Sequence, residues 1–440
     1  MPCSHILTRP IINRWLHQYE RSNNMGLGPS IKMTSLHHYD CPVTKRLLKD
    51  PEVDFVGIIE NGVSENYDAK VATAVGTGEI GAELKLDGAI VAIDGWGNHH
   101  IDFVNVIEQL GIHDIPSVGL SYIGLQGRLV ATNPYVETVV DFNKESSGYE
   151  TCNVGENNLT DMDAFKAIHI LKHKVRKSFA FRNKEASLTG EDKITGSLRR
   201  KYIDIRNAEF GEATSIENGK LVLKKGLEES LVSAEPRIKE CHVSFIMPDD
   251  NKHFWINSNL DFMPIACKEE GKLGEGVTRQ LEGIKVMLNG VEDKSGFQPA
   301  NIGSSEGMLD EHVTFDQAGT PKSSDIILHF DFLFEEGEGR TAEGIQAAHE
   351  MADRVLNEIR ATMNDAPVSH FEDFIMTSRP SKMRIGLVKI CSGLGNMYDT
   401  MVYPEQPAGV LGAYQTRDTD NKPFYMTPCE VLDGAIHSLL

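Results

Sequence analysis

A short segment near residue 100 gathers several side chains that can take part in chemistry. From Asp94 to Asp102 it reads DGWGNHHID. Glycines after a strand let the backbone approach a ligand closely, and carboxylates and imidazoles are common proton donors and acceptors in catalysis. The alternative interpretation is a tight turn with an ordinary helix cap and surface histidines. We predict catalytic roles for Asp94, His99 and Asp102, and substrate binding by Gly95, Gly97, Asn98 and His100.

Cys41 is a further catalytic candidate, because it follows His37 and His38. A nucleophilic thiolate needs a base or a cation nearby. A loop with one buried thiol explains the same cluster. His169 and His173 have helical spacing, but lysines lie beside them and the HExxH motif is absent, so we predict no metal site. The nucleotide-binding patterns GxGxxG and the P-loop are also missing from the segment around residue 95.

Alternating strands and helices position these residues. Apolar runs at 53–59, 88–93, 116–122 and 136–142 predict strands, and residues 71–86, 101–110 and 161–177 predict helices. This order predicts an α/β fold, with a mainly parallel sheet flanked by helices in a flavodoxin-like or Rossmann-like manner. Ligands bind beyond the carboxyl ends of such strands. Glu60 and Asn61 therefore join residues 94–100 at one edge of the sheet, as substrate-binding candidates.

The second half of the chain has a different pattern of predicted strands and helices. Residues 203–291 mix short strands with turns, and a long helix at 342–363 and a strand at 384–390 follow. Residues 182–200 are polar, charged and interrupted by glycines, as is typical of a linker. We therefore predict an α/β domain at 1–181, a linker at 182–200, and an α+β domain with a β-rich first part at 201–440.

Composition and net charge indicate which classes of binding partner are disfavoured. The net charge of -20 over 440 residues disfavours binding to nucleic acid or to an anionic membrane. The seven cysteines are scattered without zinc or CxxC spacing, which indicates reduced thiols in a cytoplasmic protein. The start of the sequence lacks the apolar run of a signal peptide, and no apolar run is long enough to span a membrane.

Two blocks of motifs resemble a known family, component B of the glycine, sarcosine and betaine reductases together with the D-proline reductase proprotein. The first block resembles the family's β portion: CPV at 41–43, VDFVG at 53–57, LDGAIV at 86–91 and GWGN at 95–98. The second resembles its α portion: AEFG at 208–211, ENGKL at 217–221, residues 301–306, 325–330 and 342–360, and EVLDGAI at 430–436.

The order of the blocks is the reverse of the family's. The resemblance implies a precursor with α before β, which cleaves itself before a cysteine and converts that cysteine into a pyruvoyl group that captures an amine. Here the β-like block comes first, and the position expected for the processing cysteine is Gly26. Cys3 is the only cysteine upstream of Cys41, and it lacks the usual preceding segment. A pyruvoyl group made from Cys3 is therefore not expected.

The resemblance implies a subunit of a multi-subunit oxidoreductase. It would bind an amino-acid-like or amine substrate for reductive cleavage of a C–N bond, and a separate selenocysteine- or cysteine-containing protein would supply the attacking group. We expect an oligomer and no membrane or nucleic-acid partner. The alternatives are a non-catalytic paralogue that binds a ligand or assembles a complex, and an unrelated metal enzyme that uses the histidines.

Overall fold

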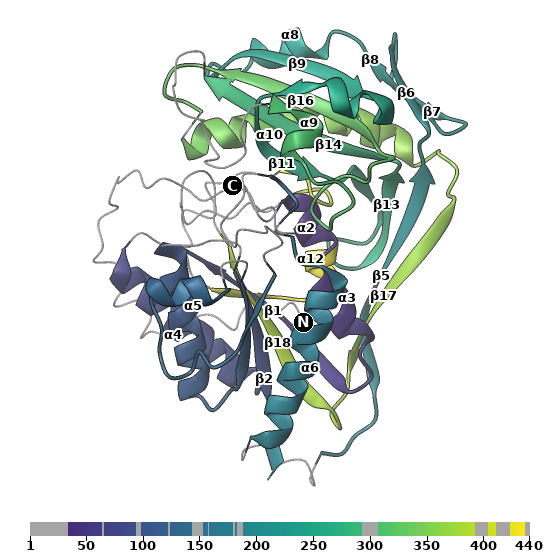
Figure 1. Cartoon of the computed structure of the whole chain (residues 1–440). Coiled ribbons are helices and arrows are strands. Elements are labelled where there is room, and N and C mark those ends of the chain that lie inside the picture. Colours follow the sequence, from purple (N-terminus) through teal and green to yellow (C-terminus); the bar gives the residue numbers. More distant parts are fainter. Residues whose placement is uncertain are drawn as a thin grey trace.

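A computed structural model describes most of the chain, in two groups of elements that lie one above the other in Figure 1. The long strands β5 and β17 run along one side and connect the two groups (Figure 1). The described residues are 34–63, 66–93, 98–121, 124–142, 153–156, 158–178, 181–182, 188–292, 307–339, 341–391, 404–410 and 423–435.

The lower group is built on a six-stranded sheet in the order β19-β1-β18-β2-β3-β4. All its strands are parallel except β19, which is antiparallel to β1. The strands are β1 (Val53–Gly62), β2 (Gly88–Ile93), β3 (Ser117–Ser121), β4 (Val139–Asp141), β18 (Met383–Cys391) and β19 (Phe424–Met426).

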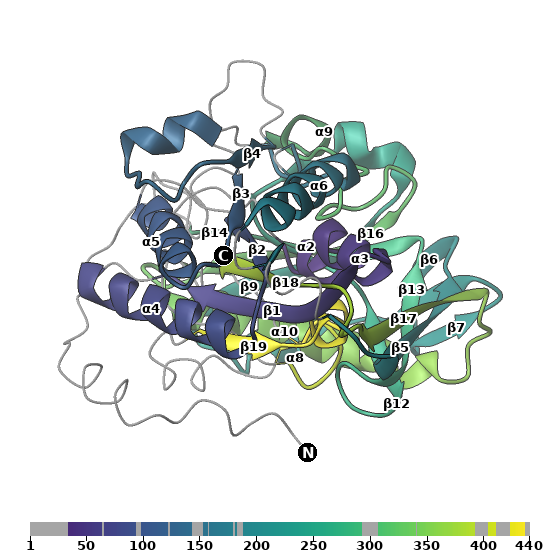
Figure 2. The same cartoon turned by 90° about the horizontal axis from the view of Figure 1, so that it is seen from below.

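Helices cover both faces of this sheet (Figure 2). One face packs its apolar side chains against α4 (Tyr67–Glu83) and α5 (Asn98–Ile112). The other packs against α3 (Pro42–Lys49) and α6 (Asp161–Lys177). Parallel strands buried on both faces need nearly continuous apolar sequence, as the runs in β1 and β2 provide. The predicted α/β fold with a mainly parallel, helix-flanked sheet is confirmed.

The central strand β18 comes from the second half of the chain. The sequence predicts a strand at 384–390 but places it in the C-terminal domain, whereas it lies between β1 and β2. Apolar side chains on both faces predict burial, but they do not say which sheet receives the strand. Because β18 and β19 complete the sheet of the first half, the predicted domain limits at 181 and 201 do not separate two self-contained sheets.

Part of the expected linker is a strand. Strand β5 (Lys193–Asp204) pairs with β13 in parallel and with β17 in antiparallel fashion, so residues 193–200 belong to a sheet. The charged pattern that predicted a connector arises because Arg199 faces solvent while Leu198 and Arg200 are buried. The buried Arg200 guanidinium donates to Asp40 Oδ1 at 3.1 Å and stacks on the Tyr39 ring.

The upper group is an α+β arrangement whose first part is rich in strands, as predicted. Helix α10 (Ala342–Met363) packs into the core of the sheet β11-β14-β16-β9. A second sheet has the order β12-β13-β5-β17, and smaller ones are β6-β8-β7 and β10-β15. The strands are β6 (Asn207–Gly211), β7 (Ser215–Glu217), β8 (Lys220–Lys224), β9 (Ile238–Ile246), β10 (Trp255–Ile256), β11 (Ser258–Met263), β12 (Ala266–Glu270), β13 (Gly276–Glu282), β14 (Ile284–Glu292), β15 (Gly307–Met308), β16 (Ile326–Phe334) and β17 (His370–Ser378).

Short helices complete the structure. They are α2 (Ser35–Tyr39), η1 (Gly124–Leu129), α8 (Leu227–Val232), η2 (Pro248–His253), α9 (Leu309–His312) and α12 (Pro428–Leu432). Among the helices of the described ranges, none combines the length and the apolar character needed to cross a bilayer.

Asp433, which follows α12, ties the end of the described chain to the upper group. Its carboxylate is fully buried and accepts hydrogen bonds from Lys268 Nζ at 2.9 Å, Gly274 N at 2.9 Å and Thr278 Oγ1 at 2.6 Å. Bonds to a buried charged group are each worth about 1.5–3 kcal/mol. The motif LDGA at 432–435 therefore has a structural role here.

We expect the substitution Asp433→Ala to lower the free energy of unfolding by about 3 kcal/mol or more, because it leaves buried donors without their acceptor. Urea denaturation measures the change. The exposed Asp365 gives a matched control, and Asp365→Ala should change the stability by less than about 0.5 kcal/mol. Equal stabilities for the two variants would contradict this role.

Candidate active site

The carboxyl ends of the parallel strands meet at one edge of the lower sheet. Glu60 and Asn61 are near the end of β1 and are register partners of Lys389 and Ile390 in β18. The residues that follow these strands include 64–65, 94–97, 122–123 and 392–403, which lie outside the described residues. The predicted site residues Asp94, Gly95 and Gly97 are among them, and Cys3 and Gly26 also lie outside the described ranges.

Helix α5 carries the rest of the predicted segment, and it begins at Asn98 rather than at 101. Its residues His99, His100 and Asp102 are all buried. The interpretation of His99 and His100 as surface histidines is therefore wrong, whereas the turn at 94–97 lies outside the described residues. The apolar residues of α5, among them Phe103, pack against the sheet, and this packing holds the first turn of the helix at the carboxyl edge.

Asp102 forms a buried ion pair with Lys70 of helix α4, and each side chain is only 1% exposed. Burial raises the pKa of Asp102 to about 7, although the Lys70 ammonium opposes this shift. A carboxyl group with a pKa near 7 is populated both with and without its proton at neutral pH. Asp102 therefore has the property required of a general acid or base.

The two histidines of α5 are neutral at physiological pH. Burial, assisted by the charge of Lys70, lowers the pKa of His99 to about 3. Burial also lowers the pKa of His100 to about 4. The His100 ring lies 5.2 Å from that of Phe103, and a side chain at Gly127 of η1 would collide with it. His100 is thus packed within the fold. His99 lies close enough to Lys70 for the charge of the lysine to help lower the pKa of the imidazole.

The two predicted residues of β1 face opposite sides of the sheet. Asn61 accepts a hydrogen bond from Thr77 Oγ1 of α4 at 2.7 Å, and it donates to Gly62 O at 2.8 Å. Asn61 therefore helps to hold α4 on the sheet. Glu60 is 0% exposed and, by the alternation along the strand, faces the side covered by α3 and α6.

Sequence reasoning missed two buried lysines at this edge. Lys70 precedes the predicted helix at 71–86, and nothing in its sequence context distinguishes it from a solvated helix residue. Lys389 stands within the apolar strand GLVKI, which is the one local signal for it, but that strand was assigned to another domain. Its Nζ lies 3.0 Å from Nδ1 of His38 in α2, and both side chains are buried.

Cys41 is not brought together with Asp102. It lies before α3 and its side chain is buried in the apolar core on the α3 and α6 face. Helix α5 packs on the other face of the sheet. The structure shows an apolar surrounding for this thiol, so the catalytic role predicted for Cys41 has no support from its geometry.

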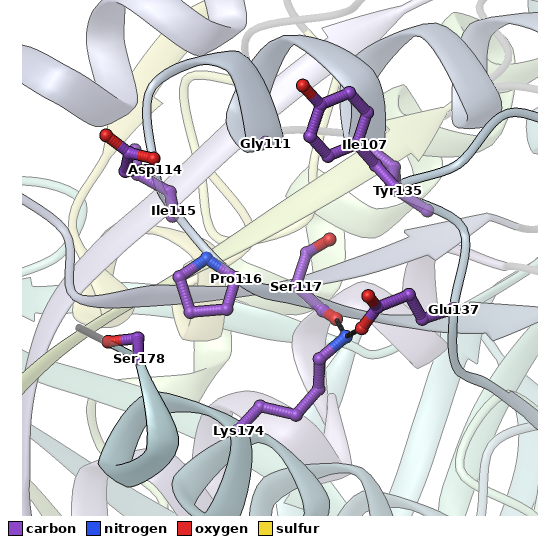
Figure 3. A pocket seen from close by; sticks show the side chains of 10 residues that line it. All are labelled: Ile107, Gly111, Asp114, Ile115, Pro116, Ser117, Tyr135, Glu137, Lys174 and Ser178. Atoms are coloured by element: carbon purple, nitrogen blue, oxygen red, sulfur yellow. Dashed lines mark hydrogen bonds and ion pairs between the residues drawn. The ribbon is translucent and has the colours of Figure 1, made fainter. Parts of the chain in front are cut away.

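A shallow hollow of about 210 Å³ lies at the opposite end of the sheet (Figure 3). It is lined by the last turns of α5 and α6 and by Ser117 at the start of β3. Lys174 reaches into it, but its Nζ donates to Ser117 O at 2.9 Å and pairs with Glu137 at 3.0 Å. Since ligands of parallel sheets bind at the carboxyl edge, we do not assign the active site to this hollow.

Comparison of the sequence with models of known families shows which family the chain belongs to. The sequence model of the glycine/sarcosine/betaine reductase component B subunits matches residues 23–147 and 197–438. The chain belongs to this family. The first range contains Glu60, Lys70, His99 and Asp102, and the second contains Lys389, so both matched ranges meet at the carboxyl edge.

Curated relatives of the reductase family match shorter stretches. The D-proline reductase proprotein PrdA of Acetoanaerobium sticklandii is 34% identical over 254 residues, which are 57% of this chain and 40% of that protein. The glycine reductase complex component B subunits alpha and beta of the same organism are 22% identical over 256 residues, 54% of each chain. The betaine reductase complex component B subunit alpha of Peptoclostridium acidaminophilum is 25% identical over 130 residues, 29% of this chain and 28% of that protein.

This chain thus spans about half the length, or less, of the curated relatives that it matches. No solved structure matches the chain. Within the described residues, no group of three or more His, Cys, Asp or Glu side chains is arranged to hold a metal ion.

Proposed function

We propose that this protein is the substrate-binding subunit of a reductase of the component B type, acting on an amino-acid-like or amine substrate at the carboxyl edge of the lower sheet. The observation that supports this most is the burial of ionisable groups there, above all the Lys70–Asp102 pair. Buried charges cost free energy, and they concentrate at functional sites. Family membership supplies the reaction class.

The proposed reaction is reductive cleavage of a C–N bond. It consumes two electrons and two protons, and it replaces the C–N bond with one C–H and one N–H bond. A separate protein with a selenol or thiol pair supplies the electrons and is itself oxidised to a selenide–sulfide or disulfide bridge. The residues of this chain bind the substrate and transfer a proton, and no step of the proposal uses a pyruvoyl group.

Asp102 is the residue that we propose to protonate the leaving amine. Its carboxyl group carries a proton in part of the molecules at neutral pH, and Lys70 stabilises the carboxylate that remains after transfer. His99, one helical turn before Asp102, is neutral and can orient a substrate by hydrogen bonding without adding charge. Lys70 is a positioning residue in this scheme.

We expect Asp102→Asn to lower the rate of amine release by roughly 100-fold or more, since a positioned general acid contributes about that much. The assay combines the purified chain with a cell extract that supplies the other reductase components, and it measures the amine formed. The exposed Asp68 of α4 provides the control, because Asp68→Asn should keep full activity. Full activity of Asp102→Asn would exclude the proposed acid.

A non-catalytic role in ligand binding or complex assembly is the second candidate. The motif at 432–435 is held by Asp433 within the fold, and Gly26 stands at the position expected for the processing cysteine. If replacing both His99 and Asp102 leaves the activity of the assembled complex unchanged, while removal of the chain abolishes it, the assembly role is supported and the catalytic one is not.

A further inference from the structure

Strands β5 and β17 carry exposed apolar side chains on one common face. Along β17 the side chains of Phe371, Ile375 and Thr377 point to the same side, because side chains alternate along a strand. Ile194 of β5 is the register partner of Thr377, so it lies on that side as well. The side chains of Phe371, Ile375 and Ile194 are 57%, 45% and 71% exposed. Three large apolar residues are thus gathered on one exposed face.

The opposite face of the same two strands is buried. Leu198 and Phe374 are register partners there, and both belong to the apolar core that includes residues of α3 and α12. The two strands lie along one outer side of the molecule in Figure 1. Single exposed apolar residues are common on protein surfaces, but a cluster of them on one face is typical of an interaction surface. The β5–β17 patch, as we call this face, comprises Ile194, Arg199, Phe371, Asp373 and Ile375.

An ion pair lies between the apolar residues of the patch. Arg199 Nε donates to Asp373 Oδ1 at 2.6 Å, and Arg199 Nη2 donates to Oδ2 at 2.8 Å. The guanidinium also lies 4.3 Å from the centre of the Phe371 ring. The charges of these two residues cancel, whereas the whole chain carries a net charge of -20. Two copies of so acidic a chain repel each other where acidic surfaces meet, and the patch avoids this repulsion.

We propose that a second copy of this chain docks on the β5–β17 patch and forms a two-fold dimer. A two-fold interface presents the same surface from both sides, so that surface must be complementary to itself. Arg199 and Asp373 are register partners on neighbouring strands. A two-fold axis that runs between β5 and β17 therefore places Arg199 of each copy opposite Asp373 of the other. This proposal does not rest on the proposed function, because no residue of the carboxyl edge takes part.

Sedimentation velocity of the full chain measures the association, over a range of about 1 to 100 μM. We expect a dimer within this range. Phe371→Ser and Ile375→Ser should each weaken it by about 10-fold or more, since each removes an apolar side chain that the interface buries. Leu129→Ser is the control, because Leu129 of η1 is 90% exposed and lies outside the patch. A wild type that stays monomeric overturns the proposal, as does a dimer that both patch variants leave unchanged.

Charge reversal tests the contact between the two copies. Arg199→Glu brings negative charges together at both contacts between the copies, and Asp373→Arg brings positive charges together, so neither variant should dimerise alone. A mixture of the two variants should form a heterodimer, because each contact then joins opposite charges. A chain that carries both substitutions should dimerise again for the same reason. Recovery of this kind distinguishes a direct contact from a loss of folding.

Another exposed ion pair provides the matched control for charge reversal. Lys220 Nζ of β8 lies 2.8 Å from Glu209 Oε2 of β6, in a separate sheet. Lys220→Glu and Glu209→Lys should therefore dimerise like the wild type. If Arg199→Glu and Asp373→Arg dimerise as tightly as these controls, or if their mixture remains monomeric, the two-fold contact at the β5–β17 patch is wrong.

Discussion

Lowering the pH from 7 to 5 is expected to reduce the free energy of unfolding by about 6 kcal/mol. Four buried histidines cause the loss. The pKa values of His37, His99 and His329 are lowered to about 3, and that of His100 to about 4, chiefly by burial. Their ordinary value in the unfolded chain is about 6.5. Below that pH the unfolded state binds protons that the folded state does not, so stability falls.

The size of the effect follows from linkage. At pH 5 each of these histidines lies about 1.5 pH units below its unfolded pKa, which costs about 2 kcal/mol per residue and about 8 kcal/mol together. Asp102 acts in the opposite direction. Its folded pKa of about 7 exceeds the unfolded value of 3.8, so the folded state gains a proton as the pH falls and recovers about 2 kcal/mol. The net loss of about 6 kcal/mol approaches the whole free energy of unfolding of a typical domain.

Urea denaturation at pH 7 and pH 5 measures the difference. His329→Phe isolates one histidine, because burial is the cause of its pKa shift and its ring already packs edge-on against Phe254 at 5.3 Å. This variant should lose about 2 kcal/mol less than the wild type between the two pH values. The exposed His242 gives the control, and His242→Asn should follow the wild type. An unchanged pH dependence in His329→Phe would contradict the explanation.

Local sequence patterns predicted the elements of the lower sheet well. Helix α6 spans the residues 161–177 that the apolar pattern indicated. The assignment of β18 to a domain failed for a physical reason. A strand that is apolar on both faces carries no information about its neighbours, since pairing over more than 290 residues is decided by packing. Strand β5 was missed because one of its faces is solvated.

The candidate site, too, could be predicted only in part from the sequence. The rule that ligands bind at the carboxyl edge of parallel strands made Glu60 and His99 candidates from the amino-acid sequence alone, and Asp102 was a candidate because it belongs to the same segment as His99. It could not find Lys70 or Lys389, since a lysine in a helix or strand is normally solvated. Their burial depends on contacts between distant segments, α4 with α5 and β18 with α2. The sequence therefore revealed the acids and imidazoles but not their cationic partners.

Lys70→Met is expected to lower the free energy of unfolding by about 3–5 kcal/mol at pH 8.5, which is the cost of leaving a buried carboxylate without its partner. At that pH most of Asp102 is ionised in the wild type. Without the ammonium the pKa of Asp102 rises further, because Lys70 is the group that opposes the effect of burial. The folded variant then takes up a proton as the pH falls, so its deficit should shrink toward pH 6.

The double variant Lys70→Met, Asp102→Leu separates the loss of the pair from the loss of one partner. Replacing a buried ion pair with apolar side chains of similar size is often neutral or stabilising, so the double variant should recover most of the stability at pH 8.5. Lys172→Met is the matched control: Glu52 and Asp50, its partners, are more exposed than Asp102, and its deficit should be smaller and should not shrink toward pH 6. A double variant no more stable than Lys70→Met would show that packing by the lysine stem, rather than the uncompensated charge of Asp102, sets the cost. In that case Asp102 would not be ionised at this edge, and its role as a proton donor with a pKa near 7 would fail with it.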